Sequence, residues 1–415
     1  MYTTTSPVMS PSEFANPLSR DSSTRSLRTY NRSRPTRIPN ERRSSRRSTS
    51  ANTSVSPALA FLSSWSRDSE QAAEPKPDDE GQAIGLNNEY IIGKKINQGG
   101  FGVIKEVHTI TEGGTSVVRA VKIVRKSDSS KDDPENDKAQ QDLDHEVSIW
   151  RHLKHPNILD LHAVYDTDYA TFCVMDYNLG GTLFDLVRRT RGSVADLSVR
   201  RGRGLESRLA RSYSYQLACA LHYLHEDIQV CHRDVKLENC LIDMSIPDAD
   251  TNGGHLRLCD FGLADFLNSD RNFDGVQMGA AGSPTSINSG SSRTTSSIIG
   301  TLEYASPKGL SVHRKLFETA GDVWAFGVIV YTLCTGVLPF KHPMPSKTVD
   351  LIMHGTWDED FLLQAVGGAH EVVELVQGCL ETDIDLRLSI SQALENPWFD
   401  GCREVTEDAS NDMWR

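Results

Sequence analysis

One stretch, residues 230–262, constrains the fold of this chain more than any other. It contains the run His-Arg-Asp-Val-Lys-Leu-Glu-Asn at 232–239, and a second run, Asp-Phe-Gly, begins at Asp260. Phosphoryl transfer needs a carboxylate to receive a hydroxyl proton, oxygen ligands for Mg²⁺ and cations beside the phosphates. Side chains of these types are present as Asp234, Lys236, Asn239 and Asp260. The stretch therefore predicts a phosphoryl-transfer site.

The pattern His-Arg-Asp-x-Lys-x-x-Asn followed by Asp-Phe-Gly resembles the eukaryotic protein kinases. The resemblance implies an α+β, bilobal fold with a small β-rich N-lobe that carries one helix and a larger helical C-lobe. It also implies ATP and Mg²⁺ as cofactors. On this resemblance Asp234 orients the target hydroxyl and accepts its proton, and Lys236 offsets charge on the moving phosphoryl group. Asn239 and Asp260 hold the Mg²⁺ ion.

A strand-like run from Glu89 leads into Asn-Gln-Gly-Gly-Phe-Gly-Val-Ile at 97–104. This resembles the Gly-rich loop of protein kinases, with Asn97 in place of the first glycine. Gly99 and Gly102 would let the backbone approach phosphates, whereas the Asn97 side chain is expected to lower nucleotide affinity. In the next strand-like run, 116–126, Arg-Ala-Val-Lys ends at Lys122. The family places its phosphate-binding lysine there.

Residues 140–153 have helical spacing and carry Glu146, which the resemblance pairs with Lys122. Without the neighbouring motifs, both charges would be interpreted as ordinary surface residues. The strand-like run 172–177 resembles the last N-lobe strand and the hinge, with Met175 as the gatekeeper. The expected adenine site consists of Ile96, Ile104, Ala120, Met175, Asp176, Tyr177 and Leu241. Aliphatic residues of an ordinary core would show the same pattern.

The segment from Asp260 to Lys308 is long, and its middle is nearly all Gly, Ser, Thr and Asn, so we expect it to be mobile. It ends in Gly-Thr-Leu-Glu-Tyr-Ala-Ser-Pro-Lys, where the family has glutamate at the position of Lys308. That glutamate pairs with an arginine matching Arg387, so the usual ion pair is not expected here. Asp322 resembles the aspartate that hydrogen-bonds the catalytic-loop backbone.

Arg233 indicates regulation, because in related kinases it clamps a phosphorylated residue of this segment. The matching residue is Ser297, and Thr301 is a second regulatory candidate. Asp265 stands where a second cation usually helps. We therefore expect phosphorylation, by an upstream kinase or by autophosphorylation, to raise activity only modestly.

The acceptor is expected to be a Ser or Thr hydroxyl of a protein, because Lys236 and the pair Gly300-Thr301 form the serine/threonine pattern. Kinases that prefer arginine upstream carry acidic residues at the positions of Thr182 and Thr332. Only Glu238 of that set is retained. A weak or absent preference for basic substrates is predicted.

Composition divides the chain into three parts: a disordered tail at 1–86, a kinase domain at 87–399 with lobes 87–176 and 177–399, and a short tail at 400–415. Residues 1–67 hold eleven arginines, no lysine and three carboxylates, although the whole chain has a net charge of −12. Three interpretations of the Arg/Ser cluster in this tail stay open: an import or acidic-partner patch, a basophilic phosphorylation site, or a solvated linker.

Eight cysteines occur singly, without zinc-ligand or disulfide spacing, and indicate a reduced compartment, cytoplasmic or nuclear. The apolar run 323–340 is interpreted as a buried helix, so no membrane span is expected. We expect no signal peptide, no nucleic-acid partner and a monomer. Helical spacing at 212–225 predicts a C-lobe helix, and the Arg-rich insertion 188–208 before it predicts a solvated loop.

Two functions are therefore considered. The first is an active Mg·ATP-dependent serine/threonine protein kinase, with some similarity to the calcium/calmodulin-dependent or AMP-activated kind. The alternative is a kinase-fold scaffold that has lost turnover and acts through its basic tail, motivated by Asn97, Ser306 and Lys308. The presence of Lys122, Glu146, Asp234, Asn239 and Asp260 favours the enzyme.

Overall fold

The computed structural model describes residues 76–99, 102–111, 113–127, 133–178, 180–190, 204–247, 249–267, 302–311 and 319–402. All of them belong to one compact unit, Glu74–Arg415. The expectation of mobility for the middle of 260–308 falls outside these residues, as does most of the expected disordered tail.

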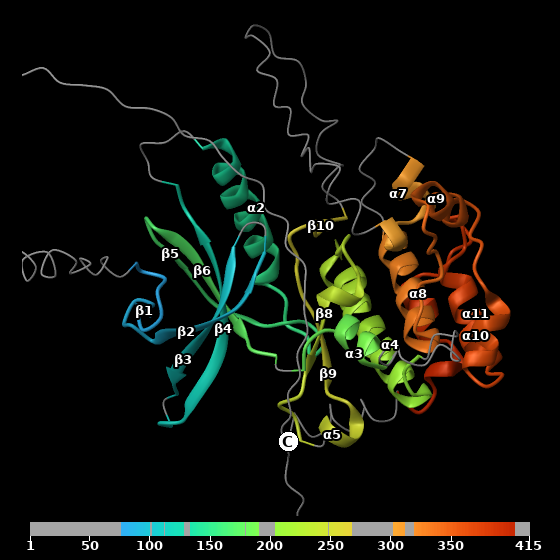
Figure 1. The fold of residues 1–415 in the computed structure, drawn as a ribbon, viewed down its shortest axis with the longest axis horizontal. Helices are drawn as coiled ribbons and strands as arrows, with labels where there is room; N and C mark the ends of the chain where they lie inside the picture. The colour runs from blue at the N-terminus through green and yellow to red at the C-terminus, as the bar shows by residue number, and fades with distance from the viewer. Residues whose placement is uncertain are drawn as a thin grey trace, which may run out of the picture. The chain divides into compact units, whose positions relative to one another are not determined.

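The first lobe is a six-stranded antiparallel sheet in the order β1-β2-β3-β4-β6-β5 (Figure 1). Its strands are β1 (Ala83–Ile84), β2 (Tyr90–Gln98), β3 (Val103–Ile110), β4 (Ser116–Arg125), β5 (Leu161–Asp166) and β6 (Ala170–Asp176). Side chains alternate along β4: Val121 and Ile123 pack in a cluster with Phe172. Ala120 and Val124 belong to the other, larger core. A β-rich N-lobe is thereby confirmed.

The start of this lobe differs from the expected boundary at residue 87. Strand β1 pairs with β2 in the register Ile84 to Tyr90, and Ile84 is 6% exposed. Asp78 is buried completely. A compositional estimate misses such a segment because one apolar side chain and one paired carboxylate hold it, without any hydrophobic periodicity.

Helix α2 (Pro134–Trp150) begins six residues earlier than the helical spacing predicted. Asp133 caps it by accepting a hydrogen bond from the Asn136 amide at 3.2 Å, and Pro134 occupies the first helical position. Proline is favourable there because its fixed φ suits a helix and no N–H is required. The acidic residues before Gln140 therefore belong to the start of the helix.

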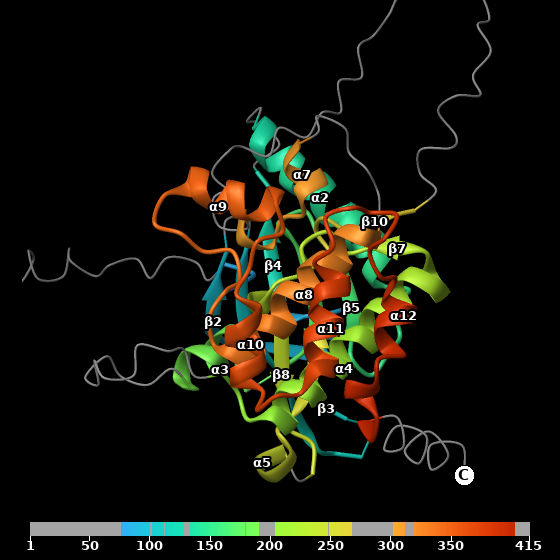
Figure 2. The ribbon, with the colours of Figure 1, turned by 90° about the vertical axis from the view of Figure 1, so that its right-hand side faces the viewer.

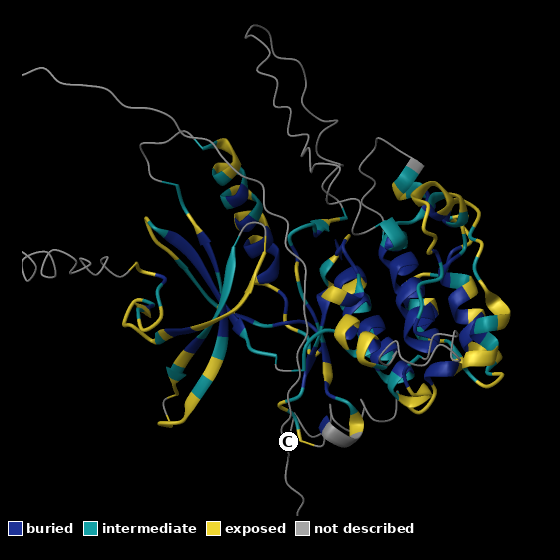
Figure 3. Cartoon of the chain, in the orientation of Figure 1, coloured by how far each residue is buried: buried dark blue, intermediate teal, exposed yellow. Residues whose placement is uncertain are grey.

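The second lobe is helical and surrounds α8 (Thr319–Thr335), whose residues from Asp322 onward are all buried (Figure 3). Helix α8 contacts α4, α10 and α11 (Figure 2). The helices are α3 (Leu183–Thr190), α4 (Ser207–His222), α5 (Ala249–Asn252), α7 (Pro307–Ser311), α9 (Pro345–Met353), α10 (Glu359–Ala365), α11 (His370–Cys379) and α12 (Ile390–Leu394). None of the described helices is long and apolar enough to cross a membrane.

Two expectations for this lobe need correction at their ends. Helix α3 includes Arg188 and Arg189, and α4 begins at Ser207, so both ends of the presumed loop 188–208 are helical. Helix α4 gives way to a π-helical segment at Tyr223–Ile228, within the predicted range. The Leu205 amide donates to the Leu333 carbonyl of α8 at 2.8 Å, a long-range anchor that arginine-rich composition does not reveal.

Two short strand pairs carry the residues of interest. Strand β7 (Val230–Cys231) pairs with β10 (Asp265–Phe266), and β8 (Cys240–Asp243) pairs with β9 (His255–Leu258). Strands β8 and β9 form a hairpin, and the connection between Asp243 and His255 contains the helical turn α5. The motif of residues 232–239 therefore lies between β7 and β8, and Asp260 follows β9.

Candidate active site

The carboxylate of Asp322 on α8 accepts hydrogen bonds from the backbone of the catalytic loop, residues 232–239. Its Oδ2 accepts from the His232 amide at 2.8 Å and from His225 Nε2 at 2.9 Å, and its Oδ1 accepts from the Arg233 amide at 2.8 Å. Burial raises the pKa of Asp322, but the hydrogen bonds and charges of His225 and His232 together outweigh burial, so the pKa lies below its usual value. Arg233 has φ +67°, a strained conformation that the Asp322 contact stabilises.

Asp234, Lys236 and Asn239 form one hydrogen-bonded group on this loop. Lys236 Nζ lies 2.6 Å from Asp234 Oδ2, and Asn239 Nδ2 donates to the same oxygen at 3.1 Å. Asn239 Nδ2 also donates to the Asp234 carbonyl at 2.8 Å. Asp234 is 8% exposed, so its carboxylate is fixed in orientation while it retains access to a substrate.

Asp260 is brought to the same group through its neighbour Cys259. The Cys259 amide donates to the Asn239 carbonyl at 2.9 Å, and His232 Nε2 donates to the Cys259 carbonyl at 3.1 Å. Asp260 has φ +68°, which only a few non-glycine residues adopt. Strained backbone of this kind concentrates at functional sites.

The donor set fits Mg²⁺. Asn239 uses its Nδ2 for both hydrogen bonds to Asp234, so its carbonyl oxygen Oδ1 remains for a cation. Among the described residues, no group of three or more His, Cys, Asp or Glu could hold a metal ion on its own. Magnesium is commonly bound by one or two protein oxygens together with substrate phosphates, which is what Asn239 and Asp260 offer.

Lys122 and Glu146 form an ion pair between β4 and α2. Lys122 Nζ lies 2.7 Å from Glu146 Oε2 and 2.9 Å from Oε1. Burial lowers the pKa of Lys122, but the charges of Glu146 and Asp260 outweigh it and raise the pKa above its usual value. Lys122 therefore stays protonated, and its ammonium group interacts electrostatically with the carboxylate of Asp260.

Three aromatic residues to which the sequence analysis assigned no role connect α2 to the catalytic loop. Phe261 is buried between the rings of Trp150 and His232, with centroids 6.2 Å and 5.2 Å away. Trp150 Nε1 donates to the Leu159 carbonyl at 2.6 Å. Trp150 lies four residues after Glu146, on the same side of the helix, and this spacing was the available signal.

The phosphate-binding loop is described on both sides of residues 100 and 101. A Cβ on Gly102 would lie 2.8 Å from the Ile123 carbonyl, so only glycine fits against β4. The Gly99 amide donates to the Gly102 carbonyl at 2.9 Å. Asn97 lies within β2, paired with Ile104, and has no positive φ. The substitution of the first glycine by Asn97 is therefore accommodated within β2, next to an irregularity in its pairing with β3 between Lys95 and Asn97.

Three of the expected adenine residues, Ile104, Ala120 and Met175, lie on one face of the sheet, and Leu241 lies on β8. Ile104 pairs with Lys122, and Ala120 pairs with Met175, so these side chains share a face. Ala120 and Met175 are buried, while Ile96 is 40% exposed. Leu241 is half-buried and bridges to Thr182 after the hinge.

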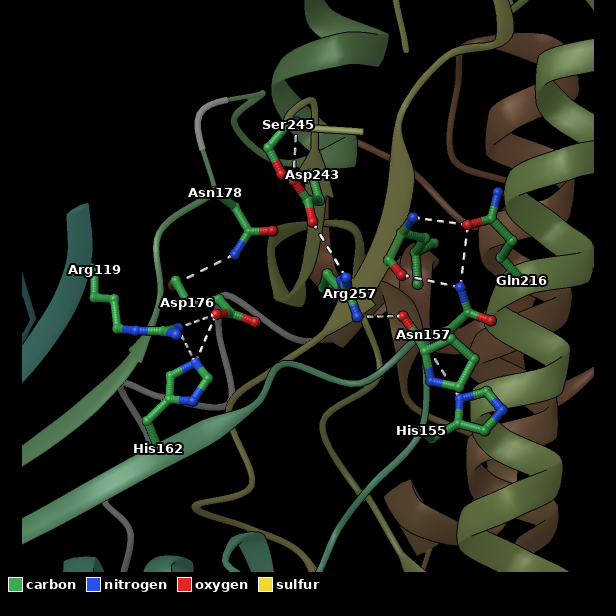
Figure 4. A network of polar contacts seen from close by, with 12 residues as sticks. Arg119, His155, Asn157, His162, Asp176, Asn178, Gln216, Asp243, Ser245 and Arg257 are labelled. Atoms are coloured by element: carbon green, nitrogen blue, oxygen red, sulfur yellow. Dashed lines mark hydrogen bonds and ion pairs between the residues drawn. The ribbon is translucent and has the colours of Figure 1, made fainter. Parts of the chain in front are cut away.

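Asp176 lies in the expected hinge, but its side chain is engaged in a charged network behind it (Figure 4). Asp176 Oδ1 accepts from Arg119 Nη1 and from His162 Nε2, each at 2.6 Å. The Asp176 carboxylate thus ties together the ends of β4, β5 and β6 rather than facing a nucleotide. The next residue, Tyr177, donates from its hydroxyl to Glu106 at 3.3 Å.

Two further groups of polar contacts lie in the C-lobe, around Arg257 and around Asn157 (Figure 4). Arg257 of β9 donates to the Pro156 carbonyl at 2.6 Å and to Asp243 Oδ2 at 3.2 Å. Asn157 Nδ2 donates to Gln216 at 3.1 Å and to the Leu256 carbonyl at 3.1 Å. The segment that follows α2 is thereby fixed to β9 and α4.

The regulatory candidates are only partly described. Arg233 Nη1 lies 3.7 Å from Asp265 Oδ2, whereas Ser297 and Thr301 lie outside the described residues. Arg387 is buried at 6% exposure, donates to the Ala320 and Glu381 carbonyls at 2.8 and 2.7 Å, and stacks 5.0 Å from the Trp324 ring. These contacts anchor Arg387 even though lysine replaces the family's glutamate at 308.

The two threonines at the specificity positions behave differently. Thr182 Oγ1 donates to Asp185 Oδ2 at 2.9 Å at the start of α3. Thr332 is 3% exposed, and its hydroxyl donates to the Val328 carbonyl at 2.7 Å within α8. Thr332 therefore cannot contact a substrate directly.

Comparison with known proteins identifies the family. The model of the protein kinase domain matches residues 90–399. Serine/threonine-protein kinase cds1 of Schizosaccharomyces pombe is 27% identical over 75% of this chain and 59% of its own length. Death-associated protein kinase 2 of Mus musculus is 28% identical over 75% of this chain and 71% of its own. Serine/threonine-protein kinase srk1 of S. pombe is 30% identical over 78% of this chain and 54% of its own.

The match thus spans little more than half the length of two of these relatives. It covers both the sheet lobe with its Lys122–Glu146 pair and the helical lobe with the catalytic loop. The chain therefore belongs to the protein kinase family and is of the serine/threonine type.

Proposed function

We propose that this chain is an active serine/threonine protein kinase that transfers the ATP γ-phosphoryl group to hydroxyls of protein substrates. The observation that carries the proposal is the formed Lys122–Glu146 ion pair, 2.7 Å long, in a lobe whose partner holds Asp234 in a network with Lys236 and Asn239. A kinase needs both arrangements together, because positioning and charge stabilisation supply nearly all of its catalysis.

Each side chain has a distinct part in this proposal. Lys122 binds the α and β phosphates, and Asn239 and Asp260 hold Mg²⁺, which neutralises charge on the phosphates. Asp234 orients the acceptor hydroxyl and receives its proton at the carboxylate. Lys236, 2.6 Å from Asp234, places its cation beside the moving phosphoryl group. Ile96, Ile104, Ala120, Met175 and Leu241 exclude water around adenine.

The scaffold alternative receives no support from the three departures that motivated it. Asn97 is paired with Ile104 within β2 without a positive φ, and Arg387 is anchored without the family's glutamate at 308. Ser306 lies at the start of α7, where its hydroxyl accepts from the Gly309 amide at 3.3 Å. None of these substitutions removes a group that the proposed chemistry uses.

The test is phosphate transfer from labelled ATP to a degenerate Ser/Thr peptide array, run beside Asp234→Asn. Asn preserves the volume and the hydrogen bonds of position 234 but cannot accept the proton. Turnover should fall by about 10²–10⁴-fold. Equal turnover in both proteins, or no transfer by the unmodified chain, would reject the proposal.

A further inference from the structure

Asp78 is a buried carboxylate in the segment that precedes the kinase motifs. Its side chain is 0% exposed. Arg125 donates to Oδ2 through Nη2 at 2.7 Å and Nε at 3.1 Å, and the Tyr169 hydroxyl donates to Oδ1 at 2.6 Å. Lys105 Nζ lies 3.7 Å from Oδ2 and also donates to the Asp78 carbonyl. Burying a charged carboxylate costs solvation free energy. We therefore expect Asp78 to have a role in the folded protein.

The segment around Asp78 is part of the sheet. The Gly81 amide donates to the Ile92 carbonyl, and the Ile92 amide donates to the Gln82 carbonyl, each at 2.8 Å. Ile84 then packs with Ile92, Val107 and Val121. The segment 76–84 is therefore docked by backbone pairing, by an apolar side chain and by the carboxylate of Asp78.

Arg125 connects this segment to α2. While its guanidinium binds Asp78, its backbone carbonyl accepts from Asn136 Nδ2 at 2.8 Å and from Gln140 Nε2 at 3.1 Å. Both amides belong to the first two turns of α2. The Ser127 amide also donates to Asn136 Oδ1 at 2.9 Å. The end of β4 thus holds the start of the helix.

We infer that Asp78 is a positioning residue for ATP binding, which acts through Arg125 on the placement of α2. Glu146 lies ten residues beyond Asn136, about 15 Å along the same rigid helix. A helix displaced at its start would move Glu146 away from Lys122. This inference rests on the proposed function, because the Lys122–Glu146 pair matters to catalysis only where ATP binds.

The first test compares Asp78→Asn with the matched control Asp79→Asn in the full-length chain. Asp79 is partly buried, and within the described part of the chain its carboxylate accepts a local hydrogen bond from the Lys76 amide at 2.8 Å. If Asp78→Asn depopulates the competent placement of α2, the apparent KM for ATP should rise about fivefold or more, while kcat at saturating ATP changes less. Asp79→Asn should leave both unchanged. Equal KM values for the two variants would overturn the inference.

The route through Arg125 is tested by a double-mutant cycle. The pair of substitutions Asn136→Ala and Gln140→Ala removes the contacts of α2 with the Arg125 carbonyl and should raise the KM for ATP in the same way. Combined with Asp78→Asn, these substitutions should add little, because both break one connection. Fully additive effects would contradict the route. Should Asp78→Asn fail to fold, Tyr169→Phe removes one donor to the carboxylate and should shift KM in the same direction.

Hydrogen exchange separates this inference from the proposed function. Backbone amides of α2 from Gln140 to Trp150 should exchange faster in Asp78→Asn than in Asp79→Asn, whether or not the chain transfers phosphate. A chain without transfer activity but with this difference would reject the function and keep the positioning role. Identical exchange in the two variants would reject the positioning role even in an active kinase.

Discussion

The guanidinium of Arg233 lies 3.7 Å from the carboxylate of Asp265, because β7 and β10 pair in the register Cys231 to Asp265. The cation that related kinases present to a phosphorylated residue thus already faces an internal carboxylate. A phosphate carries nearly twice the charge of a carboxylate at neutral pH, so it competes with Asp265 rather than filling an empty position.

The first prediction concerns phosphorylation at Ser297. In the unmodified chain we expect this phosphate to raise kcat/KM only modestly. Replacing Asp265 with Asn removes the competing charge, and the activating factor should then grow about two- to fivefold, the range of an exposed ion pair. The measurement compares phosphorylated protein with Ser297→Ala in both backgrounds, with the phosphate content determined by mass spectrometry. Asp265→Glu is the control, and a factor independent of residue 265 would refute the competition.

A second prediction addresses the contact between α2 and Phe261. Trp150→Ala would leave a cavity beside Phe261 and remove the hydrogen bond to the Leu159 carbonyl, which should cost about 3–5 kcal/mol of unfolding free energy. Trp150→Phe keeps a ring against Phe261 and loses chiefly the hydrogen bond, for about 1–3 kcal/mol. Denaturant unfolding measures both variants. Equal losses would show that the ring contact contributes nothing beyond the hydrogen bond.

The third prediction is a pH dependence at Asp322. Burial raises its pKa in the folded protein, but the hydrogen bonds and charges of His225 and His232 together outweigh burial, so the folded pKa lies below the unfolded value of 3.8. The carboxylate therefore contributes stability that is complete above pH 3.8 and is lost as pH falls through the lower, folded pKa. The difference in unfolding free energy between the unmodified chain and Asp322→Asn should be constant above that value and shrink below it. Urea titrations at a series of pH values measure this difference, and a gap that widens in acid would contradict it.

Short local patterns were enough to predict most of the site, whereas contacts between distant residues were not. Asp234, Asn239 and Asp260 occur in two compact runs, and Lys122 follows the glycine loop on a strand-like run, so the resemblance to protein kinases could locate them. Asp78 meets Arg125 across 47 positions and Tyr169 across 91. No periodicity marks such pairs, because a single carboxylate looks the same in a tail and in a core.

The hinge and the start of α2 are two further places where local sequence patterns did not predict the structure. Asp176 was expected at the nucleotide, and its position in the hinge agrees, but its side chain binds Arg119 and His162 on the other side. The direction in which the Asp176 side chain points depends on how β4, β5 and β6 are paired, and the sequence of β6 alone does not determine that pairing. The helical spacing at 140–153 did not include the six helical residues before Gln140, since the cap at Asp133 and the proline after it mark a helix start only in combination.

The fourth prediction concerns substrate choice at Thr182 and Thr332. The hydroxyl of Thr332 is buried in α8. A glutamate at position 332 would bury an unpaired charge and destabilise the helix, so it could not provide a surface charge for a basic peptide. Thr182 is only partly buried, at the start of α3, where a longer acidic side chain can extend into solvent. We therefore expect the unmodified chain to select arginine weakly or not at all on a peptide library.

Thr182→Glu should create a preference that the chain lacks. The kcat/KM for peptides with arginine upstream of the acceptor, relative to peptides with alanine there, should rise about two- to fivefold, since the new ion pair is exposed and screened. Thr182→Gln is the matched control, because it has nearly the same size and also removes the hydroxyl that contacts Asp185, but it adds no charge. The gain should decline with added salt, as an exposed ion pair requires. A gain of the same size in Thr182→Gln, or strong arginine selection by the unmodified chain, would show that other acidic side chains bind basic substrates.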